Sequence, residues 1–227
     1  MTAKNPESRS GKTRDSLIRS AIEVFGRAGY DAASTRAIAD RAGANQALIS
    51  YHFGGKKGLY LAVFEYIGVE MRQVLDPVAK EVTIAIQALP PGSAGQRELV
   101  VPLLCQILDG LLEVMARPES ESWARIILRE QQDPTEAFDL IWDFFVRKML
   151  GLVTHLVAIG SGMDENSDAC KVRAEMTVGQ VLIFLIARGT TARHMQWSEL
   201  GSSEQALIRQ QLRHSLETQF STEVSPP

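Results

Sequence analysis

The side chains best suited to chemistry in this sequence are polar groups clustered between residues 45 and 52. They are Asn45, Gln46, Ser50, Tyr51 and His52. These short or planar hydrogen-bonding groups can bind the edges of DNA bases and the oxygens of phosphates. The cluster therefore predicts a surface that contacts nucleic acid.

The flanking residues predict two short helices that present this cluster to the outside. Thr35 is a suitable N-cap for the first helix, and Gly43 can adopt the left-handed conformation that ends it. Residues 44–53 form the second helix, with Ile49 and Phe53 facing inward. A helix, a tight glycine-containing turn and a second helix within about twenty residues is the arrangement that places the second helix in the DNA major groove.

The exposed residues of this helix-turn-helix, residues 35–53, and its flank are assigned to bases or to the DNA backbone by position. Those at the start and on the exposed side of the second helix are expected to contact bases: Asn45, Gln46 and Ser50. Those at helix N-termini or flanks, where phosphates bind, are expected to contact the backbone: Thr35, Arg36, Tyr51, His52 and Lys56. Ala44 and Ala47 allow close approach, and Ala47 can meet a thymine methyl group. The alternative, that Tyr51 and His52 only cover the small core, stays open.

The preceding residues extend this pattern to a complete domain. Residues 13–28 carry a one-sided apolar stripe that predicts a helix, and Gly29 stops it. The motifs along the domain are Phe25-Gly29-Tyr30, Thr35-Arg36-x-Ile38-Ala39, Ala42-Gly43 and His52-Phe53-x-x-Lys56. On these motifs, residues 13–71 resemble the DNA-binding domain of the TetR family of bacterial transcriptional regulators. One departure concerns base preference, because the family most often has Tyr two residues before the His, where this chain has Ser50 with Tyr51 beside it.

Composition and charge restrict the class of protein. A chain of 227 residues with 45% apolar residues is ordinary for a globular protein and has room for two domains. Residues 1–58 hold ten Lys or Arg against five Asp or Glu, a balance of +5. The remainder holds fourteen against twenty-two, a balance of −8, in agreement with the net charge of −3. A basic head on an acidic body predicts that phosphates bind at the head, although Arg9, Lys12 and Arg14 could also form only a solvated N-terminal arm.

Patterns for membrane insertion, export, metal binding and catalysis are lacking in the sequence. The longest apolar run, residues 181–187, is far too short to span a bilayer, and no apolar stretch follows the charged N-terminus. Cys105 and Cys170 lack metal-type spacing and are expected to be free thiols in a reducing cytoplasm. The four histidines are scattered, and no set of residues is arranged for catalysis. We therefore expect a cytoplasmic protein with no metal, no cofactor and no enzymatic activity.

Beyond residue 56 the sequence predicts helix after helix and no strand, so the fold class is all-α in two parts. A helix from Lys56 to about Leu75 joins the parts, and Pro77 should bend or break it. A later helix begins with Asp133 as its cap and runs to about Ile159. The predicted domains are a flexible arm, the DNA-binding domain, a helical ligand-binding and dimerisation domain, and a loose tail: residues 1–12, 13–71, 72–220 and 221–227.

The C-terminal part carries a second resemblance. The run Leu128-Arg129-Glu130-Gln131 followed by Pro134-Thr135, and Gly179-Gln180 with Trp197 beyond it, are similar to the ligand-binding domain of the CecR-like subgroup. Large apolar side chains predict a small-molecule pocket lined by Leu104, Leu108, Trp123, Ile127, Phe138, Trp142 and Phe145. For each of them the alternative is ordinary core. Arg129 or Glu130 either supplies a polar anchor for the ligand or faces solvent. Glu130 and Asp133 are most simply explained as a solvated helix face and a helix cap.

Two apolar rows on the C-terminal helices predict the contact surface of a homodimer. A dimer is expected because one helix-turn-helix contacts too few base pairs to select a site. The rows are Val172, Met176, Gly179 and Ile183, and Ile208, Leu212, Leu216 and Phe220. The family resemblance implies a four-helix dimer contact on the equivalent segments. The alternative is that the rows face the chain's own core. A two-fold dimer implies an operator that is an imperfect palindrome.

Together these features predict a ligand-responsive, dimeric transcriptional regulator that acts as a repressor. Its partners would be double-stranded operator DNA, an unidentified small-molecule effector and a second copy of the chain. The resemblance implies that the helix from Lys56 to about Leu75 is the lever between pocket and DNA. The alternatives are a helical protein-interaction module without specific DNA binding and a helical enzyme. The exposed polar residues of the second helix argue against the first alternative, and the lack of a catalytic set argues against the second.

Overall fold

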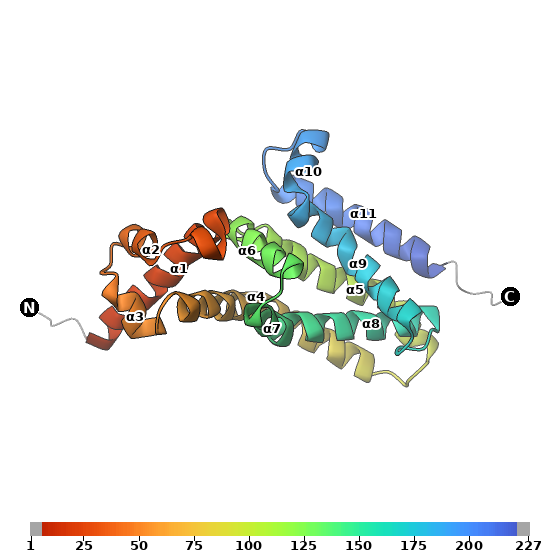
Figure 1. The fold of residues 1–227 in the computed structure, drawn as a ribbon. Helices are drawn as coiled ribbons and strands as arrows, with labels where there is room; N and C mark the ends of the chain where they lie inside the picture. The colour runs from red at the N-terminus through yellow and green to blue at the C-terminus, as the bar shows by residue number, and fades with distance from the viewer. Residues whose placement is uncertain (1–5, 222–227) are drawn as a thin grey trace, which may run out of the picture. The chain divides into compact units, whose positions relative to one another are not determined.

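The computed structural model describes residues 6–221, which contain helices and no strand and so confirm the all-α class. Figure 1 labels the elements in chain order. Their bounds are α1 Pro6–Ala32, α2 Thr35–Ala42, α3 Ala47–Phe53, α4 Lys56–Gln87, α5 Ala94–Met115, α6 Ser120–Gln132, α7 Glu136–Ile141, a π-helical segment Trp142–Val146, α8 Arg147–Ser161, α9 Asp168–Ile186, α10 Arg188–Met195 and α11 Ser202–Ser221. The predicted arm is partly helical, because α1 begins at Pro6, and residues 1–5 lie outside the described range. The predicted tail also lies outside it, except for Ser221, which ends α11.

The chain divides into two compact units that do not follow the sequence order. Unit 1 contains the residues up to Glu70 together with Glu119–Phe144, and unit 2 contains Met71–Pro118 together with the residues from Phe145 onward. Unit 1 therefore joins the predicted helix-turn-helix region to α6 and α7. The predicted domains at residues 13–71 and 72–220 were defined by function, DNA binding in the first and ligand binding and dimerisation in the second. The two compact units are defined by packing, so the predicted domains stay a prediction.

Unit 1 has a small apolar core built from α1 to α4. Fully buried side chains in this core include Leu17, Phe25, Ile38, Ile49 and Phe64. The regular part of α1 ends where predicted, because Gly29 has φ 81° and ψ 171°, outside the helical range. This core fixes α2 and α3 on the end of unit 1 and leaves their outer faces free.

Helix α6 packs along α1 within unit 1 (Figure 1). The two backbones approach closely at Gly26, where an added Cβ would lie 3.3 Å from the Ser122 carbonyl oxygen. A side chain at this position would require the neighbouring backbone to shift by a few tenths of an ångström, so the glycine favours the close contact. Helix α6 therefore packs directly on the first helix of the predicted DNA-binding region.

Unit 2 is a helical bundle in which α8, α9 and α11 pack on α5, and α8 also packs on α9. Its core includes Leu104, Leu108, Val153, Leu156 and Leu216, all buried. The segment Glu136–Ser161 is long and apolar enough to cross a membrane by length and composition alone. The burial of Val153, Leu156 and Val157 against their own chain accounts for part of that apolar character.

Three local predictions need correction. Helix α4 is not broken at Pro77 but continues to Gln87, so tertiary packing outweighs the cost of about 3 kcal/mol for an interior proline. The next helix begins at Glu136 rather than after Asp133, because Thr135 is the N-cap and its side chain accepts a hydrogen bond from Ala137 N. The sequence predicts a helix from about Ser167 to Arg188 and none directly after it, whereas the structure has a further helix, α10, over Arg188–Met195.

Candidate nucleic-acid interface

The turn between α2 and α3 has the geometry that the sequence predicts, with one change at its start. The N-cap of α2 is Ser34, whose side chain accepts a hydrogen bond from Ala37 N, and not Thr35, which is the first helical residue. Gly43 is left-handed at φ 63°, and its N–H closes the helix on the carbonyls of Ala39 and Asp40. The turn is therefore set by glycine at the one position where a side chain would be strained.

Helix α3 begins at Ala47, three residues later than predicted. Asn45 belongs to the preceding turn, and its Oδ1 accepts a hydrogen bond from Ala47 N at 2.9 Å. Because this oxygen is occupied, the amide nitrogen of Asn45 is the group left to donate outward. Asn45 thus combines a structural role at the helix start with a free donor.

The side chains predicted to contact bases lie on the outer surface. Asn45, Gln46, Ala47 and Ser50 are exposed, and Ala44 is half-buried. Beneath them Ile49 is buried and Phe53 is half-buried, with the Arg14 guanidinium 5.4 Å from the Phe53 ring centroid. The inward and outward faces of α3 therefore agree with the prediction, whereas its contacts with particular bases stay predictions.

Tyr51 and His52 behave differently from each other. Tyr51 is 79% exposed, so the alternative that it covers the core is wrong. His52 is half-buried, and its ring meets the Tyr51 ring edge-to-face at a centroid distance of 5.0 Å. A tyrosine this exposed on a monomer is suited to stacking or hydrogen bonding with a partner.

The two residues at the start of α2 that are predicted to contact the DNA backbone, Thr35 and Arg36, both interact with side chains of their own chain. Gln46 Nε2 donates to Thr35 Oγ1 at 2.8 Å, which links the turn to the first residue of α2. Arg36 is exposed, and its Nε lies 3.9 Å from the Asp40 carboxylate on the same helix. The Thr35–Gln46 hydrogen bond restricts both side chains, which would lower the entropy cost of the DNA contacts predicted for them.

Lys56 begins α4 and has two contacts that the sequence did not indicate. Its Nζ donates to the Asp31 carbonyl oxygen at 3.1 Å and lies 4.6 Å from the Tyr30 ring centroid. The neighbouring Lys57 forms an ion pair with Glu136 of α7 at 2.6 Å. The Glu136 carboxylate hydrogen-bonded to Lys57 raises the pKa of this lysine above its usual range.

The sequence reasoning missed a buried polar network that joins α4 to the α6–α7 connection. Glu130 is 4% exposed and accepts hydrogen bonds from Tyr60 Oη at 2.8 Å and from Thr135 N and Oγ1, each at 2.9 Å. The prediction that Glu130 is a solvated face is wrong, whereas Arg129 and Asp133 are exposed. Burial, followed by the hydrogen bond to Glu130, raises the pKa of Tyr60 above its usual range. The run Arg129-Glu130-Gln131 with Thr135 was the available signal, but it led only to the resemblance and to Arg129 or Glu130 as a polar anchor for a ligand.

The predicted ligand residues are divided between the two units. Trp123, Ile127, Phe138 and Trp142 belong to unit 1, and Leu104, Leu108 and Phe145 belong to unit 2. Leu104 and Leu108 have no accessible surface, which corrects their assignment, because a side chain sealed in the core cannot line a pocket. Trp142 is partly exposed and stacks on half-buried Phe138, with a distance of 6.5 Å between the ring centroids. Ile127 is half-buried, and Phe145 is buried.

Trp123 has a feature of particular interest for ligand binding. It is 4% exposed and lines a cleft of about 430 Å³ in unit 1, with Arg19, Ser20, Arg41 and Tyr66 among the other lining residues. Its Nε1–H has no hydrogen-bond partner among the described residues. A buried donor without a partner is uncommon in native proteins and is often explained by a missing water or ligand.

The two predicted dimer rows have different environments. On α9, Val172, Met176 and Ile183 are exposed, and no neighbouring heavy atom among the described residues lies within 4 Å of a Cβ built on Gly179. On α11, Ile208, Leu212 and Leu216 are buried and the helix packs on α5, which corrects their assignment to a dimer face. Phe220 is half-buried and packs over Gly160 of α8, where an added Cβ would lie 2.6 Å from Phe220 Cδ1.

Among the described residues no group of three or more His, Cys, Asp or Glu is placed to hold a metal ion. The outer face of unit 1 instead combines a helix-turn-helix, a left-handed glycine at its turn and an exposed set of amide, hydroxyl and aromatic side chains. Together with the second helical unit, this arrangement defines the class of helix-turn-helix transcriptional regulators.

The comparisons identify the family within this class. Residues 17–63 match the family described as bacterial regulatory proteins, tetR family, and residues 102–221 match the C-terminal domain of the HTH-type transcriptional dual regulator CecR. The second match covers more than half of the chain. The chain therefore belongs to the TetR family of transcriptional regulators and has a CecR-type C-terminal domain, as both resemblances predicted.

Individual relatives agree with this assignment. The HTH-type transcriptional dual regulator CecR of Shigella flexneri is 28% identical over 199 residues, which cover 88% of this chain and 87% of the relative. A TetR-like regulator from Rhodococcus sp. RHA1 has a similar fold, with a TM-score of 0.61, 16% identity and coverage of 92% and 96% of the two chains. The regulator FadR from Bacillus subtilis, solved in complex with stearoyl-CoA, gives a TM-score of 0.56 with 18% identity over 87% and 96%.

Proposed function

We propose that this TetR-family regulator is a cytoplasmic, non-enzymatic repressor that binds a palindromic operator as a homodimer and leaves it when a small molecule binds. The observation that carries the proposal is the exposed face of α3 and its preceding turn. Asn45, Gln46, Ala47, Ser50 and Tyr51 are all exposed there, while Ile49 anchors the helix from below. This face offers donors, acceptors, a methyl group and an aromatic ring to a DNA groove.

Helix α9 supports the dimer. Val172, Met176, Gly179 and Ile183 lie four, three and four residues apart and form one face of the helix, and Ile186 continues it at 53% exposure. Monomeric proteins rarely leave a long apolar stripe in water, so a second copy would gain by covering it. Gly179 at the centre allows close helix approach, and a two-fold axis there gives two reading heads for two half-sites.

The ligand site we propose includes Trp123 and the other unit 1 residues Ile127, Phe138 and Trp142. The unpaired indole N–H of Trp123 offers a donor, and the partly exposed ring of Trp142 offers a flat apolar surface. An effector needs only to bind more tightly to the form that does not fit the operator. Arg129 and Glu130 line another cleft of unit 1, about 710 Å³ in volume. Glu130 is engaged by Tyr60 and Thr135 there, so of the two residues the exposed Arg129 is the better polar anchor for a ligand in that second cleft.

The proposal is tested by selecting bound fragments from genomic DNA with the full-length protein and comparing Gln46→Ala with a matched glutamine. Gln131→Ala is the control, because this residue is also an exposed glutamine of unit 1 but lies on α6. We expect an imperfect palindrome for the wild type and for Gln131→Ala, and an altered base preference for Gln46→Ala. Selection of no common sequence by the wild-type protein would instead favour a protein-interaction module.

A further inference from the structure

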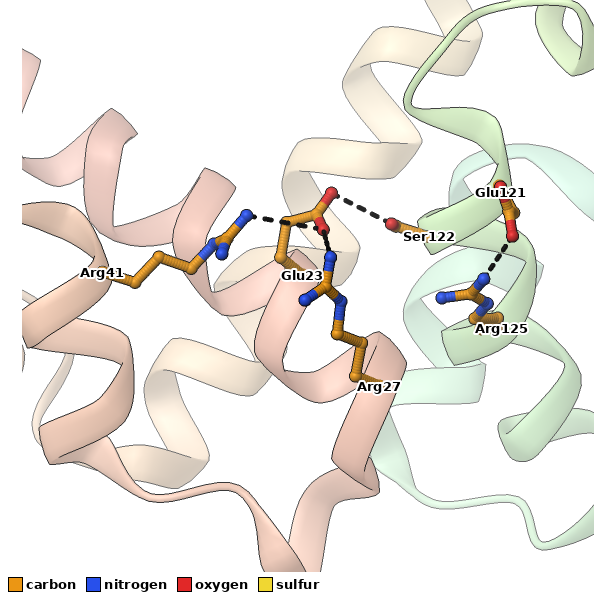
Figure 2. Close-up of polar contacts among 6 residues, drawn as sticks. All are labelled: Glu23, Arg27, Arg41, Glu121, Ser122 and Arg125. Carbon is orange, nitrogen blue, oxygen red and sulfur yellow. Dashed lines mark hydrogen bonds and ion pairs between the residues drawn. The ribbon is translucent and has the colours of Figure 1, made fainter.

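Glu23 contacts three separate parts of unit 1 through one carboxylate (Figure 2). Its Oε2 lies 3.6 Å from Arg41 Nη2 on α2 and 3.6 Å from Arg27 Nη2 on α1. Its Oε1 accepts a hydrogen bond from Ser122 Oγ on α6 at 3.0 Å. The side chain is 35% exposed, so it is accessible to water but shielded on one side.

The Arg41 end of this cluster lies next to the turn that leads into α3, the recognition helix that we propose binds the DNA groove. Arg41 is in the last turn of α2, two residues before the left-handed Gly43. A cation at this position also interacts favourably with the C-terminal end of the helix dipole. The Glu23 carboxylate therefore contacts the end of α2 that leads into the turn carrying Asn45 and Gln46.

The Ser122 end of the cluster lies on the first turn of α6. Gly26, one helical turn after Glu23, faces the Ser122 backbone without a side chain between them, so α1 and α6 pack closely at this point. A shift or rotation of α6 that moves Ser122 removes a donor from Glu23. The carboxylate can then turn away from Arg41 on α2 while it keeps Arg27, because Arg27 lies four residues further along the same helix as Glu23.

We infer that Glu23 is a positioning residue that couples the first turn of α6 to the last turn of α2 and so controls the order of the turn before the recognition helix. Its importance for operator binding rests on the proposed function. The coupling itself does not, because it can be measured without DNA.

The decisive variant is Ser122→Ala, which removes the donor on α6 without changing a residue that can contact DNA. The matched control is Glu121→Gln, which removes the charge from the neighbouring Glu121–Arg125 ion pair on the same helix, drawn beside Glu23 in Figure 2. Glu23→Gln separates the two sides of the cluster, because the amide oxygen can still accept from Ser122 while the charge that attracts Arg41 is lost. Glu23→Asp keeps the charge on a shorter side chain.

The first measurement is amide hydrogen exchange in residues 37–44 of the DNA-free protein. We expect Ser122→Ala to accelerate exchange there about three- to ten-fold, the size associated with one side-chain hydrogen bond, and Glu121→Gln to leave it unchanged. In the Glu23→Gln background, adding Ser122→Ala should have no further effect on α2, because the link to Arg41 is already lost. Glu23→Asp should restore part of the protection, which a purely steric role would not produce.

The second measurement is affinity for the selected operator. Ser122→Ala should weaken it about three- to ten-fold, and Glu121→Gln should not. Unchanged exchange in α2 on Ser122→Ala, with thermal unfolding showing a folded protein, overturns the inference. If Ser122→Ala accelerates exchange in α2 but the wild-type protein selects no operator, the coupling is supported and the proposed function is rejected. The failure of the inference and the failure of the proposed function are therefore distinguishable.

Discussion

Replacing Glu130 tests the most deeply buried carboxylate contact of unit 1. The carboxylate is 4% exposed and accepts three hydrogen bonds, one from Tyr60 Oη and two from the N–H and hydroxyl of Thr135. A hydrogen bond to a charged group contributes about 1.5–3 kcal/mol, and a buried donor left without a partner costs about 1–3 kcal/mol. Glu130→Leu has similar size but no acceptor. We therefore expect it to lower the free energy of unfolding by about 3–5 kcal/mol.

The control is Glu130→Gln, which keeps a carbonyl oxygen for Thr135 and presents its amide nitrogen to Tyr60 Oη, an oxygen that can accept. This variant should lose only about 1–2 kcal/mol, because both Thr135 donors keep their acceptor and only the Tyr60 hydroxyl proton loses the oxygen to which it donates. Urea unfolding followed by tryptophan fluorescence measures both variants, and Trp123 lies on the same helix as Glu130. A loss below about 1 kcal/mol for Glu130→Leu would refute the reasoning, since it would mean that water satisfies these donors.

The same network predicts a dependence on alkaline pH. Burial and the hydrogen bond to Glu130 raise the pKa of Tyr60 above its ordinary value of 10.0. A raised pKa means that the stabilisation is fully present below the ordinary pKa and is lost as the pH rises through the pKa of the folded protein. The wild type should therefore lose stability above pH about 10, and Tyr60→Phe should lose less over the same range. Equal losses would show that other groups control the alkaline transition.

Three further outcomes follow from the interface, the α9 stripe and the proposed switch. Lys56→Ala should weaken binding to all DNA sequences and reduce the salt slope of the binding constant by about one, whereas a slope equal to the wild-type value would show that Lys56 serves only its contacts with Tyr30 and Asp31. Met176→Glu should produce a monomer in sedimentation at micromolar concentration, unlike the similarly exposed Ile84→Glu on α4 of the same unit, and two dimeric variants would exclude α9 as the interface. The effector should lower operator affinity about 30- to 150-fold, which corresponds to a coupling of about 2–3 kcal/mol. By linkage the effector must bind more weakly by the same factor when operator is present, and calorimetry that shows equal effector affinity with and without operator would rule out the switch.

The helix-turn-helix could be predicted from the sequence because local residues determine it. Gly43 requires a left-handed turn, and the alternation of apolar and polar positions on α3 separates Ile49 from its exposed neighbours. The cap position was off by one residue, since Ser34 and Thr35 are both good caps and only the backbone conformation distinguishes them. Local chemistry thus gives the element and leaves its boundary uncertain by a residue or more.

The features that the sequence reasoning missed depend on contacts between distant residues. Glu130 is 70 residues from Tyr60, and Glu23 is 99 residues from Ser122, so no spacing rule relates them. The apolar rows on α9 and α11 have the same helical period, and only the packing of α11 on α5 reveals that Ile208 and Leu216 are core. Periodicity identifies an apolar face but not what covers it.

The two polar contacts at the ends of α6 differ in burial, and this predicts how the helix moves relative to α1 and α4. Glu130 near its C-terminal end is 4% exposed and fully engaged, whereas Glu23, which holds Ser122 near its N-terminal end, is 35% exposed. Hydrogen bonds shielded from water open less often than those that water can replace. The buried contact should therefore act as the pivot and the half-exposed contact as the end that opens.

Hydrogen exchange of the wild type and two variants tests this order. Ser122→Ala should accelerate exchange of the amides of residues 124–126 and leave those of residues 129–132 unchanged. Glu130→Gln should accelerate both groups, because it weakens the pivot itself. Equal acceleration of both groups by Ser122→Ala would mean that α6 opens as one rigid piece. A signal entering α6 would then reach the DNA-binding helices by displacement of the whole helix rather than by release of its first turn.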